Sequence, residues 1–155
     1  MTNSEVKQIF DASFLDITKK LVRLEVSRMD KIEDEQKDSL FIQGYRDKIE
    51  TKGAVNTTVI CQFPKPLFQY IISTMHGGTS PAEEEIPLYV NEYMNIICGH
   101  AISKINNITK TKSRLSVPEF YGEEEPLDFS AERDKEQYLA YESPYGVLQV
   151  YLFIE

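Results

Sequence analysis

The sequence predicts a mixed α/β fold in which an antiparallel-rich sheet packs against two long helices. Two apolar stripes at helical spacing, one near the start of the chain and one in its middle, predict the helices. Short runs rich in β-branched and aromatic residues, bounded by glycine and proline, predict the strands. The length of 155 residues fits a single domain, residues 1–155.

The first long helix starts at a capping box formed by Thr2 and Glu5. Apolar residues then recur every three or four positions and define one buried stripe: Val6, Phe10, Phe14, Ile17, Leu21 and Leu24. The charged stretch from Ser27 to Lys37 predicts a loop.

Two strands and a short helix are expected next. The strands are predicted at Leu40–Tyr45 and Val55–Phe63, with Gly53 near the turn between them. Pro66 suits the first turn of a helix and Gly77-Gly78 suits its end. The side chains expected on the buried side of this helix are Leu67, Phe68, Ile71, Ile72 and Met75.

The second long helix is predicted from Pro87 to Ile105, after a second capping-box signature at Ser80–Glu83. Five apolar residues share one side of it: Val90, Met94, Ile97, Ala101 and Ile105. Glu92, Asn95 and Gly99 lie on the opposite side, within about 60° of one another. A glycine inside a helix costs about 1 kcal/mol relative to alanine, so Gly99 either lets another surface approach closely or is simply tolerated.

The last third of the chain predicts three strands. Arg114–Val117 ends at Pro118, and Gln137–Glu142 and Gly146–Phe153 flank a turn at Ser143–Gly146. The acidic stretch between them, 119–136, predicts a solvated loop. The final strand is almost entirely apolar, which fits either a central strand of one subunit or an edge strand that pairs with another copy.

Charge and composition exclude several classes of protein. The formal net charge of −8 disfavours a nucleic-acid-binding domain. No run reaches the ~18–20 apolar residues that a membrane span needs, and the first residues lack the pattern of a signal peptide. Cys61 and Cys98 are expected as buried apolar side chains in a reducing cytoplasm. His76 and His100 show no zinc-ligand spacing, so we expect no metal ligands.

Four cations occur between residues 104 and 114 with no acid between them: Lys104, Lys110, Lys112 and Arg114. They are expected either to complement the C-terminal end of the long helix or to attract an acidic surface of a partner.

The spacing of three residues resembles a family signature. Glu92 and Asn95 form the pattern E-x-x-N, and Pro118 follows Asn95 after 22 residues, 96–117. This resembles the CheX/CheC/FliY family of chemotaxis phosphatases, whose pattern continues upstream with an Asp or Ser. Leu88 occupies that upstream position here. The order of elements is also similar to that family, so a CheC-like fold is implied.

The resemblance implies a function and roles for residues. It implies that the chain dephosphorylates a phosphorylated CheY-like response regulator, with Asn95 orienting the attacking water and Glu92 pairing with a lysine of the partner. Leu88, Gly99 and Pro118 would then border the partner. The family uses no nucleophile and no cofactor of its own, because the response regulator carries the Mg²⁺. A homodimer is implied as well.

Three other functions stay open at this point. The first is a non-catalytic binding module of the same fold that docks a signalling or flagellar-motor protein, which the departure at Leu88 favours. The second is a structural or assembly protein unrelated to chemotaxis. The third is a metal-dependent hydrolase.

Overall fold

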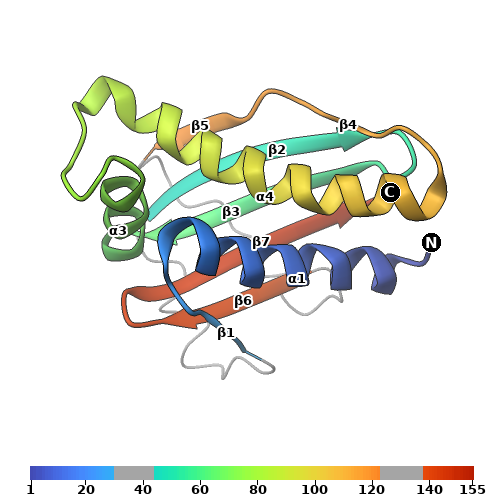
Figure 1. The fold of residues 1–155 in the computed structure, drawn as a ribbon, viewed down its shortest axis with the longest axis horizontal. Coiled ribbons are helices and arrows are strands. Elements are labelled where there is room, and N and C mark those ends of the chain that lie inside the picture. Colours follow the sequence, from blue (N-terminus) through green and yellow to red (C-terminus); the bar gives the residue numbers. More distant parts are fainter. Residues whose placement is uncertain (30–43, 123–137) are drawn as a thin grey trace.

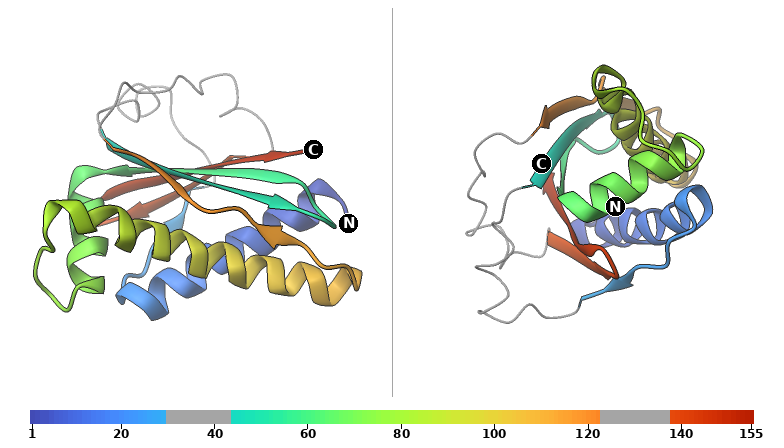
Figure 2. Two further views of the ribbon diagram at one scale, coloured as in Figure 1. Left: turned by 90° about the horizontal axis from the view of Figure 1, so that it is seen from above. Right: turned by 90° about the vertical axis from the view of Figure 1, so that its left-hand side faces the viewer.

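The computed structural model describes residues 1–29, 44–122 and 138–155. These residues form a seven-stranded sheet with its helices packed on one face (Figures 1 and 2). The helices α1 (Asn3–Val22) and α4 (Ile86–Thr109) lie side by side across the sheet, and the shorter α3 (Lys65–Met75) packs at one end. This arrangement confirms the predicted fold class.

All neighbouring strands of the sheet are antiparallel. The spatial order is β1-β6-β7-β3-β2-β4, and β5 also pairs with β2. The strands span Ser27–Arg28 (β1), Gly44–Lys52 (β2), Thr57–Pro64 (β3), Arg114–Leu115 (β4), Glu119–Gly122 (β5), Tyr138–Ser143 (β6) and Gly146–Ile154 (β7). The apolar closing strand β7 therefore lies inside the sheet, between β6 and β3, and is not an edge.

The helix α1 begins as its sequence predicts. The backbone N–H of Glu5 donates to Oγ1 of Thr2 over 3.1 Å, which caps the first turn. Val6, Phe10 and Phe14 are fully buried, so the predicted stripe faces the sheet. Arg23, in the left-handed region with φ 55°, ends the helix.

One predicted strand and two predicted loops differ from the structure. The strand expected at Leu40–Tyr45 overlaps β2 at Gly44 and Tyr45, and β2 continues to Lys52; residues 40–43 lie outside the described residues. β1 falls within the stretch predicted as a loop, as does β5 within the acidic stretch, of which 123–136 lie outside the described residues. Each of these strands pairs through its backbone although its sequence is polar, because hydrogen bonding to a neighbour does not require apolar side chains.

The region before α4 also differs from the prediction. Glu83–Glu85 form a short 3₁₀-helix that leads into α4 without a side-chain cap, so the capping box expected at Ser80 does not form. α4 itself is longer than predicted and ends at Lys110, which has φ 58°. None of the helices among the described residues is long and apolar enough to cross a membrane.

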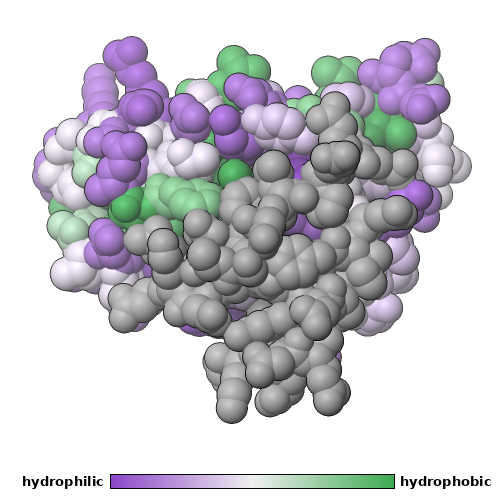
Figure 3. All heavy atoms as spheres, turned by 180° about the vertical axis from the view of Figure 1, so that it is seen from behind, coloured by the Kyte–Doolittle hydropathy of each residue, from purple (hydrophilic) through white to green (hydrophobic). Residues whose placement is uncertain are grey.

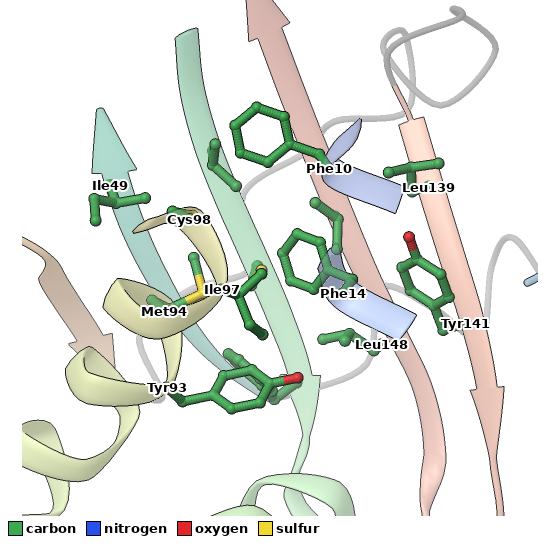
Figure 4. Packing of buried hydrophobic residues seen from close by; sticks show 14 of the residues in the cluster. Phe10, Phe14, Ile49, Tyr93, Met94, Ile97, Cys98, Leu139, Tyr141 and Leu148 are labelled. Carbon is green, nitrogen blue, oxygen red and sulfur yellow. The ribbon is translucent and has the colours of Figure 1, made fainter. Parts of the chain in front are cut away.

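One continuous core lies between the sheet and the helices (Figure 4). Phe10 and Phe14 of α1 enter it from one side, and Met94 and Ile97 of α4 enter it from the other. Cys61 and Cys98 are buried there as free thiols, and burial raises the pKa of both. They are therefore protonated apolar side chains, in agreement with the sequence.

The other face of the sheet carries a row of buried polar side chains beside apolar ones such as Ile60. Arg46, Gln62 and Gln149 lie at matching positions of β2, β3 and β7, and all three are buried. Figure 3 shows the molecule from this side. Tyr138 and Tyr151 each donate a hydrogen bond to Oε1 of Gln149, at 3.0 and 2.9 Å, so polar contacts order this face.

One carboxyl group lies inside the core. Asp47 of β2 is completely buried, and neither of its oxygens has a hydrogen-bond partner among the described residues. Its position on β2 alternates with that of Arg46, so its side chain points toward α4, on the same side as Ile49. Burial raises the pKa of this carboxyl to about 8, because the interior does not solvate its charged form.

We expect this carboxyl to make the stability of the fold depend on pH. The folded chain keeps a proton on Asp47 up to about pH 8, whereas the unfolded chain releases it near the ordinary carboxyl pKa of 3.8. The free energy of unfolding should therefore fall as the pH rises between these two values, by a few kcal/mol in total. In Asp47→Asn this fall should be absent, as measured by urea denaturation at about pH 5 and about pH 8.5. Equal pH dependence in the two proteins would contradict the assignment.

Candidate functional site

The candidate site lies on the middle of α4, where one side of the helix leaves the core. Val90, Met94, Ile97, Ala101 and Ile105 are all at most 1% exposed, which confirms the predicted core side. Glu92 is exposed and Asn95 is half-buried on the other side. Residues three apart in a helix are neighbours on its surface, so a carboxylate and a carboxamide stand together there.

Two anchors fix this turn of the helix. Tyr93 and Met94, the residues between Glu92 and Asn95, are completely buried. The hydroxyl of Tyr93 lies 2.7 Å from Oγ1 of Thr18 on α1, and its ring packs edge-on against Phe63 of β3. Figure 4 shows both anchors directed into the core. Rotation of the helix would expose these side chains, so the orientation of Glu92 and Asn95 is set by core packing.

A second contact between helices supports the same orientation. Nδ1 of His100 lies 2.9 Å from Oγ of Ser13, which joins α4 to α1 one turn beyond the candidate site. His100 therefore packs at the flank of the helix, as its sequence position predicts.

The two polar side chains of the site have no partner among the described residues. Neither Glu92 nor Asn95 forms a side-chain hydrogen bond or an ion pair with any residue in the ranges that the structure describes. A polar pair that is held rigidly but has no internal partner is suited to contact another molecule.

Gly99 is approached by the chain itself. The closest side-chain atom to the position of an added Cβ is Cδ1 of Leu115, at 3.8 Å, which is an ordinary van der Waals contact. The edge strand β4 therefore lies along this side of α4. Gly99 borders the site. The segment that packs close to this glycine includes β4 of the same chain.

Pro118 is buried at a β-bulge. Leu115 pairs with Thr51, Ser116 exchanges backbone and side-chain hydrogen bonds with Glu50 at 2.8 Å, and Glu119 pairs with Lys48. Val117 and Pro118 are thus two residues opposite one, Ile49.

The bulge explains the proline. Pro118 has no N–H to donate, so a bulge accommodates it where a regular strand would not. Pro118 is buried, so little of its own surface is exposed, and its contact with a partner stays a prediction. Its neighbour Val117 is instead turned outward and is 83% exposed.

Leu88 lies one turn before Glu92, close to the start of α4, and its side chain is 68% exposed. It is not part of the core, so a polar residue would be accommodated there equally well. An exposed leucine beside the polar pair is available for contact with a partner.

The described residues contain no group of three or more His, Cys, Asp or Glu side chains that could hold a metal ion. Cys98 is buried and His100 points toward α1, so these two neighbours do not act together. The three acidic residues Glu83–Glu85 are exposed on the short 3₁₀-helix.

Sequence reasoning did not find every residue around the site. Val117 and Ser116 belong to the bulge, whose presence depends on pairing with β2, and β2 itself was placed too early in the chain. Asn91, one turn before Asn95, buries its Oδ1 without a hydrogen-bond partner among the described residues. No local pattern distinguishes it from an ordinary polar residue of a helix.

Comparison with known proteins identifies relatives of this architecture. The family model described as "Chemotaxis phosphatase CheX" matches residues 48–140. No curated protein matches the chain in sequence.

Solved structures share the fold across almost the whole chain. The chemotaxis protein CheX from Vibrio vulnificus is 19% identical, with a TM-score of 0.76, and the match covers 97% of this chain and 99% of that one. A CheC-like superfamily protein from Shewanella sp. PV-4 is 17% identical, with a TM-score of 0.75, and covers 100% and 99%. CheX in the CheX–CheY–BeF₃–Mg²⁺ complex from Borrelia burgdorferi is 14% identical, with a TM-score of 0.68, and covers 96% of each chain.

The geometry at Gly99 leads to a prediction about stability. An alanine Cβ meets only an ordinary contact with Leu115, so Gly99→Ala should raise the free energy of unfolding by about 1 kcal/mol through helix propensity. Thermal and urea denaturation measure this change. Ser103→Ala, at an exposed position of the same helix, serves as the control for a propensity effect alone. A loss of stability in Gly99→Ala would show that β4 packs more tightly against α4 than described.

Proposed function

The chain belongs to the CheX family of chemotaxis phosphatases, and we propose that it hydrolyses the aspartyl phosphate of a CheY-like response regulator. The observation that supports this proposal best is the pair formed by Glu92 and Asn95. Both side chains leave the core side of α4, both lack an internal partner in the described chain, and both flank anchors that are completely buried.

Asn95 is suited to orient the attacking water. An aspartyl phosphate is a reactive acyl phosphate, so catalysis requires mainly that water be held in line with the P–O bond. A carboxamide offers one acceptor and two donors and stays neutral beside the phosphoryl oxygens. A carboxylate in the same place would be repelled by them. As the water attacks phosphorus, the aspartyl oxygen of the partner leaves as a carboxylate with the electrons of the P–O bond, and both protons of the water end on the inorganic phosphate that is released.

Glu92 is suited to anchor the partner. It is exposed one turn from Asn95, so a lysine near the phosphorylation site of the partner can pair with it while Asn95 reaches the phosphoryl group. Such an ion pair fixes the register between the two proteins more than it adds affinity. The Borrelia burgdorferi relative is seen with a CheY carrying BeF₃ and Mg²⁺, which supports the same class of partner for this chain.

The proposed hydrolysis needs no metal ion and no nucleophile from this chain. We propose that Mg²⁺ is supplied by the response regulator and that the chain carries no cofactor of its own. We also propose that it works in the cytoplasm, where two buried free thiols such as Cys61 and Cys98 stay reduced.

A homodimer is a further part of the proposal, taken from the family resemblance. Because β7 is paired on both sides, a second copy must use another surface than the closing strand. Light scattering of the purified chain tests the oligomeric state.

A second candidate function is a non-catalytic docking module of the same fold. The exposed side chain of Leu88, where the family pattern has Asp or Ser, favours it. Phosphate release from a phosphorylated response regulator, measured with and without the chain, separates the two functions. Binding without acceleration selects the docking module.

The mechanism predicts the effect of removing the carboxamide. Asn95→Ala should reduce the stimulated release of phosphate by about 100-fold or more, because the water is no longer held in line. The fold should be unchanged, since Asn95 forms no hydrogen bond within the described chain. Asn107→Ala, an exposed asparagine on the same helix, is the matched control. Activity of Asn95→Ala equal to that of Asn107→Ala would rule out the proposed mechanism.

The anchoring role predicts a different effect for the acid. Glu92→Gln should raise by about tenfold the concentration of chain needed for half-maximal dephosphorylation, because it removes the ion pair with the partner. Titration of a phosphorylated regulator at constant ionic strength measures this shift. Glu84→Gln removes one exposed carboxylate outside the site and controls for the change in net charge. Equal shifts in the two variants would contradict a specific anchor.

A further inference from the structure

Four cations meet at one corner of the molecule, which we call the basic corner: Lys52, Lys110, Lys112 and Arg114. They come from the end of β2, the C-terminal end of α4 and the start of β4, and all four are exposed. The sequence showed three of them but not Lys52, which is far away in the chain. In Figure 3 hydrophilic residues gather at the upper left of the molecule, beside paler and apolar ones.

The basic corner has no acidic partner in the described part of the chain. None of its four side chains forms an ion pair or hydrogen bond with any residue in the parts of the chain that the structure describes. Glu50, which lies on the same strand as Lys52, is already paired with Lys48 at 3.6 Å. The described residues carry 13 cations and 13 acids, so four cations together without a paired acid form a local excess of positive charge.

Two of these cations are placed unfavourably for stability. Lys52 and Arg114 are directly opposite each other on the antiparallel strands β2 and β4. Like charges at such a pair destabilise the sheet. A side-chain arrangement that opposes folding is easier to understand if an external anion relieves it.

The helix end accounts for little of this charge. Favourable interaction with a helix C-terminus falls off within the last turn, and the last turn of α4 contains no basic residue. Lys110 directly follows the helix, but Lys112, Arg114 and Lys52 lie beyond it. Lys104, which the sequence grouped with them, lies on the side of α4 that faces α1 and Asp16.

The basic corner is close to the candidate site. Leu115, the neighbour of Arg114, contacts the position of a Cβ on Gly99, and Gly99 lies one turn from Asn95. Lys110 follows Asn95 by 15 residues along α4, which corresponds to about 22 Å. A protein domain of ~100 residues has a radius of gyration of about 13 Å, so one that docks on Asn95 extends over this distance.

We propose that the basic corner steers an acidic surface of the phosphorylated response regulator onto the site. This inference rests on the proposed function. The phosphoryl group and the carboxylates that hold its Mg²⁺ make the approaching face of that partner anionic. Such a face is attracted to the basic corner, where four cations lie together without an acid paired to them in the described chain.

A protein fits the basic corner better than a nucleic acid does. Four cations at one corner match the few carboxylates of a compact acidic patch, whereas tight binding of a duplex depends on cations along a longer stretch of its phosphate backbone.

The test measures the rate of association without hydrolysis. The regulator is loaded with BeF₃⁻ and Mg²⁺, and its binding is followed by stopped flow at about 20 mM and about 200 mM salt. The double variant Lys110→Ser/Lys112→Ser should associate about tenfold more slowly at low salt and show a weaker salt dependence. The control Lys19→Ser/Lys20→Ser makes the same change in net charge on α1, where both lysines are already paired with acids. It should slow association less than twofold.

Lys52→Thr separates steering from a structural role. Removing one of the two opposed cations should raise the free energy of unfolding slightly and at the same time slow association. A residue that only stabilised the sheet would not give this opposite pair of changes.

The results distinguish this inference from the proposed function. Equal slowing by the two double variants, or slowing by neither, overturns steering even where the chain releases phosphate. If the Lys110/Lys112 variant associates more slowly than the control but the parent chain does not release phosphate, the steering inference holds and the docking function is selected. Loss of binding to a DNA duplex in the Lys110/Lys112 variant, with unchanged association of the regulator, overturns the inference in favour of nucleic acid. No association of the regulator with the parent chain overturns both proposals.

Discussion

The burial of one side of α4 is the constraint on which the rest of the site depends. Tyr93 and Met94 are completely enclosed between α1 and the sheet, and the hydrogen bond between Tyr93 and Thr18 fixes the helix against its neighbour. In a helix, burial of two adjacent residues determines the direction of the residues on either side of them. The core therefore supplies the rigidity that a water-positioning group needs, and Glu92 and Asn95 need no support of their own.

Helices and apolar strands of this fold were predictable because their sequences repeat with the period of the structure. The stripe of α1, the core side of α4 and the closing hairpin were predicted in nearly their observed positions. The outward direction of Glu92 and Asn95 followed from the same period, since the angle around a helix is fixed by position. That Gly99 would be met by Leu115 of the same chain did not follow, because it depends on a contact between distant segments.

The polar strands were not predictable from local pattern. β2 alternates Arg46, Lys48 and Glu50 on one face with Asp47 and Ile49 on the other, which reads as an exposed charged stretch. It is nevertheless central to the described sheet, with β3 on one side and β4 and β5 on the other. The burial of Pro118 was hidden for the same reason, since the bulge that holds it exists only where the edge segment meets β2. Sequence spacing identified that proline as important but not as a residue of the interior.

The position of β7 has a consequence for how the molecule assembles. Within the described ranges, β6 and β1 join the rest of the sheet only through β7. β7 pairs with β3 some 90 residues earlier in the chain, as Ile60 opposite Tyr151 shows. Local hairpins therefore cannot complete the sheet, and its two halves unite only when a long loop closes. Contacts of such large sequence separation slow folding. The sheet on which α4 packs is therefore expected to form late and in one cooperative step.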